Sequence, residues 1–71
     1  MPPLPRVSGR DTVAALQKAG FSIRRQRGSH IILEKPGTLS VPNHRELKPG
    51  TLRALIRVSG LTVDKFVALL S

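Results

Sequence analysis

The stretch "RQRGSHIILEKPG", Arg25–Gly37, contains two turn signals that divide the middle of this 71-residue chain into short runs. "GS" at 28–29 and "PG" at 36–37 each interrupt extended, partly apolar sequence. The runs around them, 21–27, 30–35 and 38–41, have the length of ordinary strands. The sequence therefore predicts three short antiparallel strands joined by tight turns.

Alternation predicts which side chains share a face of the first strand. Ile23 and Arg25 are expected on one side, and Arg24 and Gln26 on the other. After the third run, Pro42 is expected to end the strand because proline cannot donate to the ladder.

Helical patterns flank these runs. On the N-terminal side, Ser8 is a candidate cap with Asp11 three positions on, and Gly20 is expected to end the helix in a left-handed conformation. On the C-terminal side, Pro49 suits a first helical turn and Gly60 a second left-handed ending, before a short final helix. The order predicts an α+β domain with a double-stranded-RNA-binding-domain-like α-β-β-β-α arrangement, in which helices cover one face of a three-stranded antiparallel sheet.

Composition limits the domain organisation. A chain of this length forms one small domain, expected here over residues 8–71, and residues 1–7 are rich in proline and read as an extended arm outside the core. The absence of cysteine excludes disulfides and fits a reducing compartment, and no run reaches membrane-spanning length. A cytoplasmic protein with no membrane partner is expected.

Net charge indicates the class of partner. Twelve Lys and Arg, eight of them Arg, against four acidic residues leave a net charge of +8. Such a surface favours polyanions, and the guanidinium fork matches phosphate oxygens two at a time. Nucleic acid is the first candidate; an acidic protein, an anionic membrane or a merely solvated basic surface are the alternatives.

His30 is the candidate catalytic residue, because it lies at the start of a strand beside a glycine turn. If Ile31 and Leu33 face the helices, His30 points away from them; the opposite register would bury it. An imidazole can take up and return a proton near neutral pH, and the ribose 2′-hydroxyl of RNA supplies its own nucleophile. The pattern therefore favours RNA cleavage, with an ordinary structural histidine as the alternative.

Groups expected to hold phosphate surround His30 in the sequence. The backbone amides of Gly28 and Ser29 could bond phosphate oxygens, although "GS" is equally a plain hairpin turn. The cationic side chains expected at phosphate are Arg24, Arg25, Arg27 and Lys35. His44 could protonate a leaving group but is more simply a loop residue. Two histidines and four acids do not form a two-metal site, so no metal or small-molecule cofactor is expected.

The ordered motifs "GF", "GSH", "VP.H", "GTLR" and "GLT" between Ser8 and Phe66 resemble the HicA family of small bacterial toxins. The resemblance implies a double-stranded-RNA-binding-like fold, ribonuclease activity on mRNA, and a HicB-like antitoxin that covers the active site. It also implies that the histidine of "GSH", here His30, is catalytic, with Gly28 and Ser29 as its companions. The proline-rich arm before Ser8 departs from the family pattern.

Two other functions remain open on the sequence alone. A module of this fold can bind duplex RNA without cleaving it. Residues 51–70 can also be read as a helix-turn-helix, but its second helix carries Phe66 and Val67 rather than side chains that read base edges. That face is typical of a core.

Overall fold

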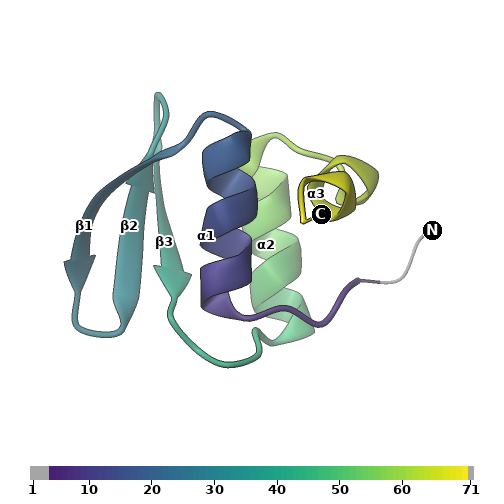
Figure 1. The fold of residues 1–71 in the computed structure, drawn as a ribbon, viewed down its shortest axis with the longest axis horizontal. Coiled ribbons are helices and arrows are strands. Elements are labelled where there is room, and N and C mark those ends of the chain that lie inside the picture. The colour runs from purple at the N-terminus through teal and green to yellow at the C-terminus, as the bar shows by residue number, and fades with distance from the viewer. Residues whose placement is uncertain (1–3, 71) are drawn as a thin grey trace.

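The computed structural model describes residues 4–70, which form a single sheet covered on one face by helices (Figure 1). The strands are antiparallel and lie in the order β1-β2-β3, which confirms the predicted meander and the α+β class. The element bounds are α1 Gly9–Lys18, β1 Ser22–Arg27, β2 His30–Glu34, β3 Thr38–Pro42, α2 Pro49–Ser59 and α3 Val63–Leu69.

The ends of α1 follow the capping chemistry expected from its sequence. The Ser8 hydroxyl accepts a hydrogen bond from the Asp11 backbone N–H at 3.0 Å. At the other end, Gly20 has a φ of 105°, and the Phe21 N–H donates to the Leu16 carbonyl at 3.0 Å. This bond is the six-residue closure of a Schellman ending, which brings Phe21 back onto the helix.

The end of α2 uses a different set of bonds. Gly60 takes a φ of 83°, as predicted, but the Leu61 N–H donates to the Ser59 hydroxyl at 3.3 Å. That hydroxyl in turn donates to the Ile56 carbonyl at 2.6 Å. A serine side chain therefore replaces one backbone bond at this helix end.

The core lies between the sheet and the helices, and α3 packs against α1 on the side away from the sheet (Figure 1). Leu33 and Val41 come from the sheet, and Leu16, Leu52 and Phe66 from the helices; each is at most 1% exposed. Burying one such side chain contributes about 1.5–3 kcal/mol. Because all three helices lie on one side, the opposite face of the sheet, here called the outer face, is left open to solvent.

The pairing of β1 with β2 contains a bulge. Ile23 pairs with Leu33 and Arg25 with Ile32, so that Arg24 is an extra residue with no residue paired to it across the strands. Side chains that face each other across an antiparallel pair lie on the same face of the sheet. The extra residue therefore reverses the alternation for the rest of the strand.

The bulge corrects the predicted faces of β1. Arg25, opposite Ile32, lies on the outer face, whereas Gln26, opposite Ile31, lies on the helix side. The expectation that Arg25 shares a face with Ile23 is wrong, because strict alternation holds only in a strand without a bulge.

The N-terminal segment is only partly separate from the core. Residues 1–3 of the predicted arm lie outside the described residues. Val7, by contrast, is 7% exposed within the core cluster, and its carbonyl accepts from the Leu47 N–H at 2.8 Å. Leu4 also packs against the core. The expectation that residues 1–7 stay outside the core is therefore wrong for Val7. Between residues 4 and 70, no helix is long and apolar enough to cross a membrane.

Candidate catalytic site on the outer face of the sheet

A two-residue turn brings His30 to the start of β2. Gly28 has a φ of 58° while Ser29 keeps a negative φ, which is the pattern of a type II′ hairpin turn. Arg27 and His30 are the pair that closes this turn. The Gln26 side-chain amide donates a hydrogen bond to the Gly28 carbonyl at 3.1 Å, which stabilises the turn. The glycine is required here because its φ is one that other residues rarely adopt.

The register of β2 is the one that exposes His30. Leu33 is fully buried and Ile31 packs against the core, so that His30 and Ile32 point to the outer face. β2 is the central strand, with Arg27 of β1 on one side of His30 and Pro42 of β3 on the other. The imidazole therefore lies at the middle of the sheet's width, on the face that the helices leave open.

An open depression surrounds His30 on this face. Its walls come from all three strands and from the β1–β2 turn, and it is lined by Arg27, Gly28, His30, Ile32 and Ser40. The bulge adds Arg25 to the same face, because its cross-strand partner Ile32 lies within the depression. An extended chain could lie across this floor without displacing any part of the core.

Arg24 joins the outer face through an ion pair. Its guanidinium contacts the Glu34 carboxylate at 3.0 Å, and the side chains are 60% and 42% exposed. Pairs this exposed contribute about 0.2–1 kcal/mol, so the bond is easily exchanged for another anion. Arg24, Arg25 and Arg27 together therefore present three guanidinium groups on the face that carries His30.

The His30 side chain is exposed and has no partner. Within residues 4–70 no hydrogen bond or ion pair involves its imidazole. Both ring nitrogens are thus available to a ligand, and no carboxylate fixes which of them carries the proton. An imidazole of this kind can exchange a proton with a bound hydroxyl.

Lys35, which was named from the sequence as a phosphate contact, lies apart from His30. Lys35 follows the far end of β2, about 16 Å along the strand at the usual rise per residue. Its ammonium donates to the Ala19 carbonyl at the end of α1 at 2.9 Å and lies 5.7 Å from the centre of the Phe21 ring. His44 is exposed in the loop after β3, two residues beyond the cross-strand neighbour of His30, and within residues 4–70 its side chain forms no hydrogen bond or ion pair.

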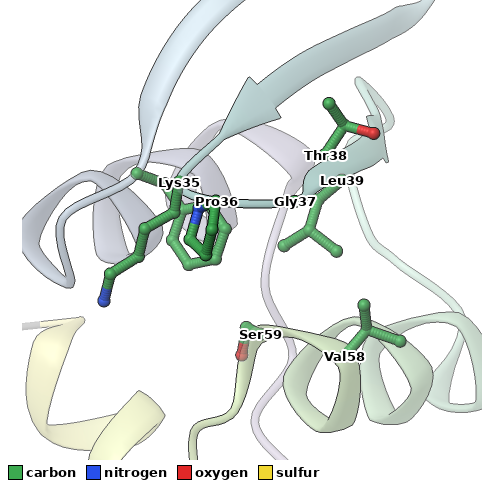
Figure 2. Close-up of a pocket in the computed structure, with 8 residues that line it drawn as sticks. Lys35, Pro36, Gly37, Thr38, Leu39, Val58 and Ser59 are labelled. Atoms are coloured by element: carbon green, nitrogen blue, oxygen red, sulfur yellow. The ribbon is translucent and has the colours of Figure 1, made fainter.

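A second, more enclosed pocket lies at the Lys35 end of the sheet. Figure 2 shows the β2–β3 turn on one side of it and the end of α2 on the other. The lining is largely apolar, with Phe21 and Leu39 from the core and the exposed Val58, and it contains no histidine or acid. Its polar side chains are Lys35, which donates to the Ala19 carbonyl, Ser59, which donates to the Ile56 carbonyl, and Thr38.

The loop after β3 makes contacts that sequence analysis missed. The Asn43 N–H donates to the Ser29 carbonyl at 2.6 Å and ties the His30 hairpin to this loop. The Gly9 N–H donates to the His44 carbonyl at 2.8 Å and ties the same loop to the start of α1. Backbone bonds between distant segments leave no residue pattern that a sequence reading could detect.

A model of the HicA toxin family, described as a toxin of bacterial toxin–antitoxin systems, matches residues 9–61. These residues include all three strands, the hairpin and His30. No curated protein shows a significant match to the chain.

Among residues 4–70, no three His, Cys, Asp or Glu side chains gather as they would around a metal ion.

Proposed function

Since the chain belongs to the HicA toxin family of bacterial toxin–antitoxin systems, we propose that it is an endoribonuclease that cuts mRNA with His30. The observation that supports this proposal most directly is the exposed, unpartnered imidazole on a face that also carries three arginines. A HicB-like antitoxin is the partner that would cover this face, and the cytoplasm, where mRNA is translated, is the compartment.

The proposed reaction uses the nucleophile that RNA carries. His30 takes the proton from a ribose 2′-hydroxyl, and the oxygen attacks the adjacent phosphorus. The bond from phosphorus to the 5′-oxygen breaks, and that oxygen takes up a proton, so no net proton is consumed. The products are a 2′,3′-cyclic phosphate and a 5′-hydroxyl. Base catalysis of this kind contributes about 10²–10⁴-fold in rate.

The arginines would supply the electrostatic part of catalysis. Arg27 pairs with His30 across the two strands and lines the same depression, which supports a contact between its guanidinium and the phosphate next to the reacting 2′-hydroxyl. Arg24 and Arg25 would hold neighbouring phosphates of the strand. Charge that develops on phosphoryl oxygens in the transition state is stabilised by such fixed cations. Lys35 lies at the other end of β2, so we assign the substrate contact to the arginines.

A substrate with one altered sugar tests the mechanism. A short RNA with a single 2′-deoxy nucleotide at its main cleavage site should resist cleavage at that bond, while other bonds are cut at the unmodified rate. Product ends mapped by mass spectrometry should carry the cyclic phosphate. Equal cleavage of the deoxy bond would reject this mechanism. RNA binding without any cleavage would instead favour a non-catalytic RNA-binding module.

Removal of the acid on the outer face should strengthen RNA binding. Glu34→Gln releases Arg24 from its ion pair and removes a negative charge beside the proposed phosphate path. We expect the Kd for a short RNA at low salt to fall about two- to fivefold, because surface pairs contribute at most about 1 kcal/mol. Fluorescence anisotropy measures this change. Asp64→Asn removes the same charge from α3 and should leave the Kd unchanged; an equal effect in both variants would contradict the local role of Glu34.

A further inference from the structure

A second group of cations adjoins the hairpin that carries His30. The Asn43 N–H bonds to the Ser29 carbonyl of the hairpin, and the Leu47 N–H bonds to the Val7 carbonyl. The loop between β3 and α2 therefore runs from the hairpin past the start of α1 to the start of α2. At this end of the molecule, the lower end in Figure 1, the β1–β2 turn and the first turns of α1 and α2 lie together.

Four exposed cations lie along this path, and we call them the basic rim: Arg6, Arg10, Arg45 and Lys48. Within residues 4–70, none of the four forms an ion pair or a side-chain hydrogen bond. Two acids, Asp11 and Glu46, lie among them, so the rim keeps a positive balance. The rim lies at the same end of the molecule as the β1–β2 turn, which Arg27 and His30 close.

The burial of the phenylalanines limits the ways in which the protein could bind RNA bases. Both phenylalanines are buried, Phe21 at 8% and Phe66 at 0% exposure, and the chain has no Tyr or Trp. Proteins that grip single strands through their bases stack them on exposed aromatic rings. No phenylalanine, tyrosine or tryptophan offers such a platform, so most of the RNA affinity is expected from contacts between the exposed cations and the sugar-phosphate backbone.

We propose that the basic rim binds the backbone of the RNA strand on one side of the phosphate held at His30. This inference rests on the proposed function, since it takes RNA as the ligand. The substrate would cross the outer face at Arg27 and His30 and then follow the loop after β3 towards Lys48. The rim would thus add phosphate contacts to those of the arginines on the outer face, and RNA beyond the cleaved bond would contribute to affinity.

The salt dependence of binding tests the rim. The measurement uses His30→Ala, so that RNA stays intact, and adds Arg45→Gln with Lys48→Gln. Each lost phosphate contact flattens the slope of log K against log salt by about 0.7 for single strands, so the double variant should lose about 1.4. The control Arg57→Gln with Lys65→Gln removes equal charge from the ends of α2 and α3 and should keep the slope. An unchanged slope in the rim variant, or equal changes in both, overturns the proposal.

A nested series of RNAs checks the direction of the path. Shortening the RNA from one end should weaken binding to the protein with an intact rim and have little further effect on the rim variant. If both proteins respond alike to truncation, the rim does not hold the strand. If the rim variant keeps its RNA affinity and loses only binding to the antitoxin, the rim is a protein interface and the proposal is wrong. Because affinity is measured without cleavage, failure of wild-type protein to cut RNA would reject the proposed function separately.

Discussion

His30→Ala should lower kcat for RNA cleavage by about 10²–10⁴-fold, the usual contribution of a general base. The effect should fall on kcat rather than on binding, because the imidazole has no partner within the described residues and the neighbouring arginines remain. RNA affinity of the variant should therefore stay within about twofold of wild type. The measurement is single-turnover cleavage of a defined RNA, with the Kd determined in parallel.

His44→Ala is the matched comparison for this prediction. It removes an exposed imidazole from the neighbouring loop, whose backbone is fixed by the bond from the Gly9 N–H to the His44 carbonyl. Because that bond uses no side-chain atom, the variant should fold normally and keep kcat within a few fold. Cleavage by His30→Ala at the wild-type rate would remove the basis of the proposed mechanism. A loss in His44→Ala as large as that in His30→Ala would assign the leaving-group proton to His44.

Gly9→Ala should destabilise the fold by about 1–3 kcal/mol, the usual cost of forcing extra atoms into a packed site. An added Cβ at this position would overlap the Pro42 carbonyl oxygen and lie 2.9 Å from the Asn43 Cα. Both contacts are backbone atoms, so no flexible side chain can move aside. Thermal unfolding should show a fall of about 4–8 °C in Tm for each kcal/mol lost.

Gly50→Ala is the control for the glycine prediction. Gly50 also lies in the first turn of a helix, but apart from its chain neighbours and the backbone of its own helix no atom lies within 4 Å of its added Cβ. Alanine is the better helix former, so this variant should be neutral or stabilised by up to about 1 kcal/mol. If Gly9→Ala were as stable as Gly50→Ala, the close approach of α1 to the end of β3 would not constrain the fold.

The backbone that Gly9 contacts also supports the candidate site. Pro42 is the cross-strand neighbour of His30, and Asn43 bonds to the Ser29 carbonyl. A displacement of this backbone by the new methyl group would pass to the hairpin. Gly9→Ala should therefore lose some cleavage activity even below its Tm, which an assay at low temperature can measure.

Features set by neighbours in the chain could be predicted from the sequence. Ser8 caps α1, Gly20 and Gly60 end helices with positive φ, and Gly28 opens the hairpin turn. Each depends on a side chain, or the lack of one, within a few residues of the backbone it serves. His30 could be singled out for the same reason, because a histidine directly after a glycine turn at a strand end is visible in the residue order.

Features set by contacts between distant segments could not be predicted. The bulge at Arg24 exists because β1 pairs with β2 in one particular register, and it moves Arg25 to the face of His30. Lys35, adjacent to β2 in the sequence, bonds to the Ala19 carbonyl because α1 ends beside it in space. The sequence alone thus determined the order of the elements, the strand ends to within one residue, and the candidate base. Tertiary structure decided which cations share a surface with that base, because pairing register and helix packing are summed over contacts between residues far apart in the chain.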